Sequence, residues 1–174
     1  MLREPAFPEA EFDQVKRQRL AGIENTRTDP AALAPLALNR AMNPFPRGDV
    51  RYVGTIDEQI EDVNKVSLDE VRKFQARFYG ASHGELVVVG QFKEPELRAA
   101  AAELLGTWSA AAPFERITTN YQKTTPVNLK IETPDKQNAT FEAALAFAMS
   151  DTNPDYPAMV LANYMFGGSI TARA

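Results

Sequence analysis

The stretch from residue 108 to 126 lacks any sustained apolar period, and it constrains how this chain can fold more than any other feature. Small, hydroxylated and proline residues dominate it, which is typical of a linker. It divides a chain of 174 residues, a length that suffices for one globular domain or for two lobes of about 90 residues. We therefore expect two α/β segments, over residues 1–107 and 127–174, joined by a linker over 108–126.

Helices are indicated on both sides of the linker by apolar stripes and capping residues. Asp29 precedes Pro30, which suits the first position of a helix, and Ser67 with Glu70 three residues later has the pattern of a capping box. Pro35 removes a backbone donor inside the second helix. The expected helices cover residues 8–26, 30–42, 57–64, 68–79, 94–105 and 155–166.

Three other segments have the pattern of β-strands. The run from Leu86 to Val89 within residues 84–92 is typical of a strand buried on both faces. Apolar and polar residues alternate over 127–131, and apolar residues of one parity recur over 141–149. We therefore predict an α+β fold, with helices packed on a mixed or antiparallel sheet. Each of the two segments is expected to be incomplete, so exposed sheet edges and self-association are expected.

Charge and the two ends of the chain exclude several classes of protein. The formal charge is −4, which disfavours a nucleic-acid groove or a polybasic membrane patch. Residues 2–5 do not open an apolar signal sequence, and the apolar runs are far too short to span a membrane. The chain stops soon after Gly167 and Gly168 without a closing element, so we expect it to be a piece of a longer polypeptide.

Catalytic side chains are scarce. The chain has no cysteine and a single histidine, His83, so it lacks a thiolate nucleophile and the two or three imidazoles of a usual zinc hydrolase. His83 lies in a turn over residues 80–84, where a capping or solvent-facing role is expected. Acidic pairs such as Asp57 with Glu58 lie at helix starts, where the helix dipole favours negative charge. The residues alone predict no catalytic, metal-binding or cofactor-binding site, and they leave substrate-binding residues unknown.

Several separated segments together resemble the pitrilysin/insulinase family of zinc peptidases, the inverted zincins. Their order and spacing extend over nearly the whole chain. The segments are Pro5 to Ile23, Arg51-Tyr52-Val53-Gly54-Thr55, Val66 to Val71, Phe78-Tyr79-Gly80, Glu85 to Gly90, Leu105 to Trp108, Asn153 to Pro157, and Leu161 to Gly168. The chain is most similar to the second, non-catalytic half of long bacterial members.

The resemblance implies a clamshell of two homologous halves, each made of two α/β sublobes, that encloses peptide substrates. It implies that residues 1–107 are the latter part of one sublobe and residues 127–174 the opening part of the next. It also implies that the catalytic half carries H-x-x-E-H, in which two histidines bind zinc and the glutamate activates water, with a further glutamate as third ligand. This chain has no such motif. On the helix that matches the third-ligand helix, Glu11 is followed seven residues later by Gln18, so a neutral amide replaces the carboxylate ligand. Family members also use an arginine and a tyrosine that lie beyond the turn matched by residues 171–174, so Arg173 is not that arginine.

We therefore predict a non-catalytic half that shapes the substrate chamber, with zinc and hydrolysis in an H-x-x-E-H half outside this chain. The expected partners are that half and peptide substrates, with neither nucleic acid nor membrane, and the resemblance implies a periplasmic location. A second hypothesis is a structural or assembly subunit, like the processing-peptidase and respiratory-complex core relatives. A third, a small free-standing enzyme that uses its carboxylates, is disfavoured by the exposed positions expected for the acidic pairs.

Overall fold

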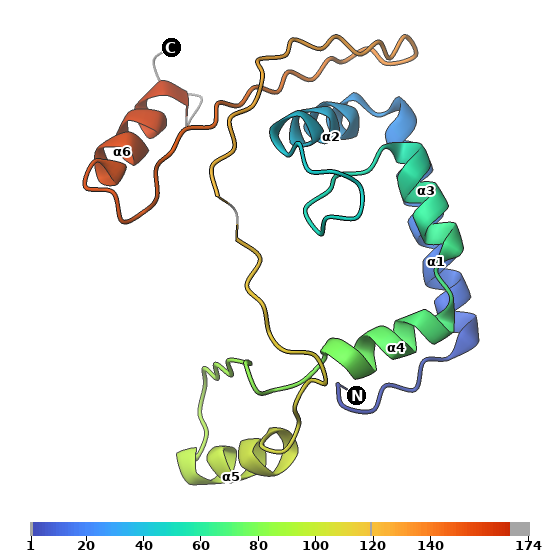
Figure 1. Cartoon of the computed structure of the whole chain (residues 1–174), viewed down its shortest axis with the longest axis vertical. Coiled ribbons are helices and arrows are strands. Elements are labelled where there is room, and N and C mark those ends of the chain that lie inside the picture. Colours follow the sequence, from blue (N-terminus) through green and yellow to red (C-terminus); the bar gives the residue numbers. More distant parts are fainter. Residues whose placement is uncertain (1, 119, 168–174) are drawn as a thin grey trace.

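The computed structural model describes residues 2–118 and 120–167, and Figure 1 shows them as separate helices joined by long extended segments. Helices form where the capping residues and apolar stripes predict them, with bounds that coincide or differ by one residue. Their bounds are α1 Glu9–Asn25, a 3₁₀ helix η1 Thr26–Thr28, α2 Pro30–Met42, α3 Ile56–Lys65, α4 Leu68–Phe78, α5 Glu94–Leu105 and α6 Tyr156–Gly167.

The predicted α+β fold is wrong for the described part of the chain, which contains helices and no strand. A strand needs a neighbour that accepts and donates ladder hydrogen bonds, and none of the three predicted strands has one. The run Leu86 to Val89 is exposed, with 93% of Val89 and 81% of Val87 accessible to solvent. The expected sheet edges are part of the same error. The division of the chain into two sublobes and a linker stays a prediction.

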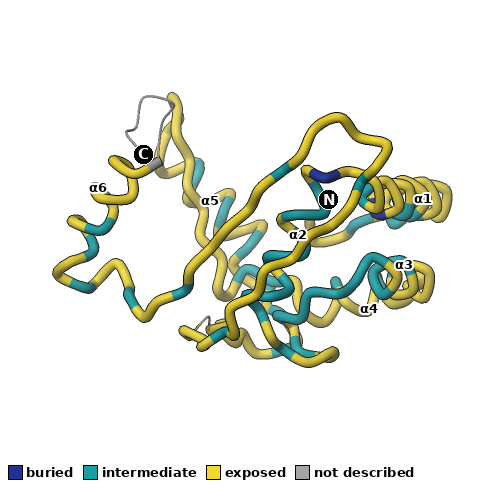
Figure 2. Tube along the Cα trace, turned by 90° about the horizontal axis from the view of Figure 1, so that it is seen from above, coloured by how far each residue is buried: buried dark blue, intermediate teal, exposed yellow. Residues whose placement is uncertain are grey.

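The central packing unit is the antiparallel pair of α1 and α3, which overlap in the view of Figure 1 and lie side by side in Figure 2. Ile23 of α1 is only 5% exposed and packs near the start of α3. At the other end, Lys16 Nζ donates to the backbone oxygens of Asn64 and Val66, both at 2.8 Å. Carbonyls at a helix end have no partner within the helix, and a cation there is favoured by the dipole. Lys16 therefore closes the C-terminal end of α3.

Two further contacts hold the lower part of the molecule together. The segment before α1 lies against α4, because Gln75 Nε2 donates to the oxygen of Leu2 at 3.2 Å. The chain after α5 returns to the end of α4, where the Ala81 amide donates to the oxygen of Trp108 at 2.7 Å. Gly80 makes this approach possible, since a Cβ atom on Gly80 would lie 2.2 Å from the backbone nitrogen of Ala110.

Most of the apolar surface stays in contact with solvent. Ile23 and Pro30 are the buried residues of the described chain, and Figure 2 shows how little dark blue the trace carries. The accessible surface is 14560 Å² for a chain of 19.2 kDa. A compact monomer of that mass exposes about 8,400 Å². The fold therefore leaves about 6,000 Å² more surface uncovered than a self-contained domain of this size.

We expect Ile23→Ala to lower the free energy of unfolding by about 2 kcal/mol, near the lower limit for such a truncation because a small pocket already adjoins the side chain. Val15→Ala, which alters an exposed position of the same helix, serves as the control. Urea unfolding followed by circular dichroism measures both. Equal effects of the two substitutions would show that Ile23 does not centre the helix pair.

Gly80→Ala is expected to lower the free energy of unfolding by about 1–3 kcal/mol, because the new methyl group meets the backbone at residues 109–110. Gly22→Ala is the matched control: its Cβ meets nothing within 4 Å on α1, and alanine in a helix interior stabilises by about 1 kcal/mol. Amide hydrogen exchange should accelerate at Ala81 in the first variant only. Unchanged exchange at Ala81 would contradict the close approach.

Candidate functional site

The densest polar cluster ties the loop of residues 43–55 to α3. Arg47 lies opposite three carboxylates of that helix, at 3.2 Å from Glu58, 3.4 Å from Glu61 and 2.6 Å from Asp62. These ion pairs are largely exposed, and exposed pairs contribute about 0–1 kcal/mol each. Their effect is mainly to fix where the loop lies along the helix.

Glu58 is the centre of this cluster. Its carboxylate accepts hydrogen bonds from the Thr55 amide and from the Tyr52 hydroxyl, both at 2.7 Å. The Glu58 amide in turn donates to the Thr55 hydroxyl at 3.1 Å, which completes a capping box at the start of α3. The Thr55 amide, followed by the Tyr52 hydroxyl, lowers the pKa of Glu58 from its ordinary value of 4.5 to about 2.

A second pair stands beside it in the same loop. Arg51 donates to both carboxylate oxygens of Asp49, at 2.9 and 2.8 Å, and this contact lowers the pKa of Asp49 to about 2. The Arg51 guanidinium also lies 3.9 Å from the centre of the Phe45 ring and donates to the oxygen of Thr118 at 3.3 Å. Arg51 thus joins the loop to the linker.

These carboxylates are unsuited to proton transfer at neutral pH. A general acid needs a pKa close to the working pH, whereas Glu58 and Asp49 remain ionised far below it. The cluster is a clamp that caps α3 and orders the loop. The motif Arg51 to Thr55 therefore has a structural role here. The spacing of Thr55 and Glu58 is that of a capping box, a signal that the predicted helix over residues 57–64 did not use. The contacts of Arg47 depend on the path of the loop and had no signal in the sequence.

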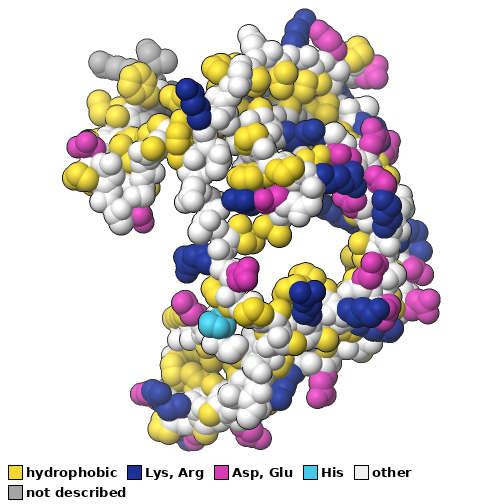
Figure 3. All heavy atoms as spheres, viewed as in Figure 1, with side chains coloured by type: hydrophobic (Ala, Val, Ile, Leu, Met, Phe, Trp, Pro, Cys, Tyr) yellow, Lys and Arg dark blue, Asp and Glu magenta, His cyan; other side chains and the backbone are white. Residues whose placement is uncertain are grey.

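The residues singled out from the sequence are not brought together. Glu11 and Gln18 are exposed on α1, and whether Gln18 occupies a former ligand position stays a prediction. His83 lies at the surface (Figure 3) and stacks on Phe114 with ring centres 5.0 Å apart. In residues 2–118 and 120–167, no three side chains of histidine, aspartate or glutamate gather in a way that would hold a metal ion. Arg173 lies outside the described residues.

Acidic pairs at helix starts take part in surface ion pairs, as the helix-face interpretation expects. Asp57 pairs with Arg27, and Asp69 lies 2.6 Å from Lys73. No helix in the described part of the chain is long and apolar enough to cross a membrane.

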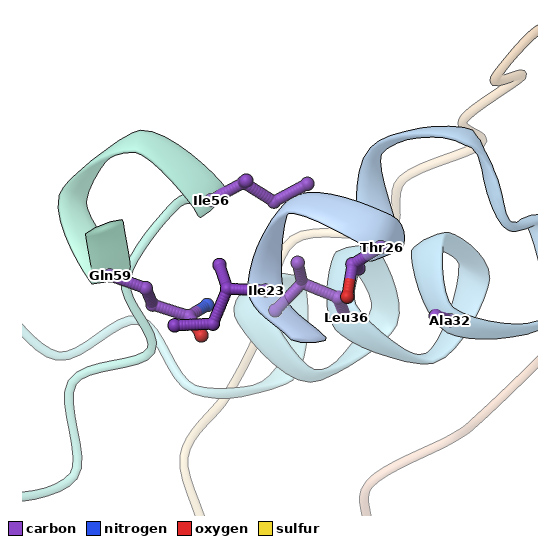
Figure 4. Close-up of a pocket in the computed structure, with 6 residues that line it drawn as sticks. All are labelled: Ile23, Thr26, Ala32, Leu36, Ile56 and Gln59. Atoms are coloured by element: carbon purple, nitrogen blue, oxygen red, sulfur yellow. The ribbon is translucent and has the colours of Figure 1, made fainter. Parts of the chain in front are cut away.

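Two hollows lie around α2. The smaller, about 210 Å³, is enclosed by α1, η1, α2 and α3, and Figure 4 shows Ile23 between Gln59 of α3 and Leu36 of α2. Its two polar side chains are engaged elsewhere: Gln59 donates to the oxygen of Gly54, and Thr26 donates to the oxygen of Gly22. This hollow is a packing gap. The larger hollow, about 510 Å³, is an open groove between α2, the start of α3 and the extended segment 127–131.

Comparison with known proteins places the chain in a family. The sequence profile described as "Peptidase M16 inactive domain" matches residues 65–174, which is more than half of the chain. The chain therefore belongs to this family, in agreement with the non-catalytic half of pitrilysin/insulinase-type peptidases that its motifs resemble. The match includes the motifs from Val66 onward, while the Arg47 and Arg51 clamp precedes it. No curated protein and no solved structure matches the chain.

Tyr52→Phe is expected to raise the pKa of Glu58 from about 2 while leaving it below 4.5, because the Thr55 amide still donates. Since the folded-state pKa is lowered, the contribution of Glu58 to stability is complete above the unfolded value near 4.5 and is lost as the pH falls toward 2. Carboxyl-carbon NMR titration of Glu58 measures the change. Tyr121→Phe, at an exposed linker position, is the control, and an equal shift in both variants would contradict the assignment.

Proposed function

We propose that this chain is part of the non-catalytic half of a zinc metallopeptidase, where it shapes the chamber that holds peptide substrates. Hydrolysis would be carried out by an H-x-x-E-H half outside this chain. The observation that carries the proposal is the match of residues 65–174 to the inactive peptidase domain. A polypeptide with one histidine and no cysteine also lacks the ligands that a catalytic zinc site normally uses.

The uncovered surface supports a partner half. A standard protein–protein interface buries about 800 Å² on each side, whereas this fold exposes about 6,000 Å² beyond that of a compact monomer. Large apolar side chains contribute to it on every part of the chain, among them Phe141 at 89% and Phe166 at 77% exposure. An extensive, lasting cover fits this surface better than a transient contact. Self-association would provide cover as well and remains a prediction.

The competing proposal is a purely structural or assembly subunit with no peptidase partner. A structural subunit would contain the same inactive domain and would also need a partner to cover its exposed apolar surface. These two observations therefore fit both proposals equally. The two differ in whether an H-x-x-E-H half binds this chain. A periplasmic location also stays a prediction from the resemblance.

Reconstitution separates the two. We expect this chain to bind an H-x-x-E-H half from the same genome and to raise its cleavage of a quenched fluorescent peptide mixture at least about tenfold, because the chamber is then closed on both sides. Replacing both motif histidines by alanine in that half should abolish the gain. Binding without any gain in cleavage, or no binding, would favour the structural subunit.

Zinc titration by calorimetry tests the inactive assignment on this chain alone. We expect no tight stoichiometric binding of zinc chloride, because three suitable ligands do not converge in the described residues. Glu11→Ala and His83→Ala variants identify the ligand if binding occurs, with Glu115→Ala as an exposed control. Stoichiometric binding that either of the first two variants abolishes would overturn the assignment.

A further inference from the structure

The open groove beside α2 combines an apolar floor with a charged rim. Its floor is one stripe of the helix, at the i, i+3, i+4 and i+8 positions that share a helix face. The stripe residues are Leu33, Leu36, Ala37 and Ala41. Ile56 at the start of α3 closes one side, and Leu129 with Ile131 closes the other.

Arg40 stands on this groove without an anionic partner. It is half-buried in the last turn of α2, and it forms neither an ion pair nor a hydrogen bond with the other residues that the structure describes. The rim also holds Arg27 and Asp57, which pair with each other. The lining therefore carries one uncompensated positive charge. Tyr52 is close enough to Arg40 for the positive charge to act on its hydroxyl. That hydroxyl donates to Glu58, so Tyr52 is not an anionic partner of Arg40.

The extended segment that carries Leu129 and Ile131 forms one side of the groove and indicates the chemical class of the ligand. Residues 127–132 make no backbone hydrogen bond to the described residues, so this extended segment keeps a row of amide and carbonyl groups without backbone partners among them. A peptide main chain satisfies such a row, and apolar side chains from the peptide fill the hollows. The rise from Leu33 to Arg40 is about 10 Å along the helix, the length of about three extended residues.

We propose that this groove binds a short extended peptide segment that has apolar side chains and one carboxylate, which pairs with Arg40. The proposal deepens the proposed function in one respect, since it names a class of peptide that the chamber wall would hold. It needs neither zinc nor the catalytic half for its test. A failure of reconstitution therefore leaves it standing, and a failure of peptide binding leaves the reconstitution result standing.

The test uses the full chain and two fluorescein-labelled peptide amides, Val-Leu-Val-Glu and Val-Leu-Val-Gln, followed by fluorescence anisotropy. We expect the acidic peptide to bind about tenfold more tightly, which is the usual gain from a charge-assisted contact. Arg40→Gln should remove that difference, and Arg40→Lys should keep part of it. Arg17→Gln, which removes the same charge from an exposed position of α1, should leave both affinities unchanged.

The apolar floor is tested with Leu33→Ser, which should weaken both peptides alike, against Leu104→Ser at an exposed position of α5. Circular dichroism verifies that each variant keeps its helix content. Equal binding of the two peptides to the parent chain overturns the proposal, as does a difference that survives Arg40→Gln.

A second copy of the chain is the competing occupant, and analytical ultracentrifugation of the same samples detects it. A monomer that binds the acidic peptide supports the proposal. Dimerisation that excludes the peptide and is abolished by Leu33→Ser overturns it. Cross-linking with a photoreactive form of the acidic peptide identifies where the peptide binds. Labels found only outside α2 and residues 127–131 also overturn the proposal.

Discussion

The antiparallel packing of α1 on α3 is the contact on which the described structure depends. Lys16 closes the carbonyl end of α3, Ile23 fills the space near its start, and Arg27 pairs with Asp57 in the first turn. Lys16 and Ile23 belong to α1 and Arg27 to the η1 turn that follows it, and together they fix both ends of α3. Because α3 is fixed, its Glu58, Glu61 and Asp62 carboxylates stand where Arg47 meets them. The order of the loop before α3 follows from that helix pair.

Beyond this unit the chain makes few contacts with itself. The groove beside α2, the run from Leu86 to Val89 and the apolar residues of α6 all face solvent. Burial of apolar surface is the main favourable term in folding, so these segments contribute little until something covers them. Membership in the family of inactive peptidase domains offers a reason for this exposed apolar surface. Under the proposed function, this apolar surface is the part of the chain that a catalytic half and substrate would cover.

Sequence patterns predicted the helices and failed on the strands for a physical reason. Helix signals such as Asp29 before Pro30 and Ser67 with Glu70 act within a few residues, so they remain valid whatever surrounds the segment. The alternation over 127–131 and the run Leu86 to Val89 report only that a segment prefers burial. Whether a strand forms depends on a neighbouring strand, which no local pattern specifies. The site shows the same division, because the capping box of Thr55 is local while Arg47 reaches α3 through the fold of a loop.

We propose that this chain is part of a non-catalytic half whose apolar surface is covered by an H-x-x-E-H half. Hydrogen–deuterium exchange of the chain alone and in that complex tests it most directly. We expect slower exchange in residues 85–89 and in α6 on complex formation, with unchanged exchange in the helix pair around Ile23. Identical exchange of residues 85–89 and α6 in the two samples would contradict it.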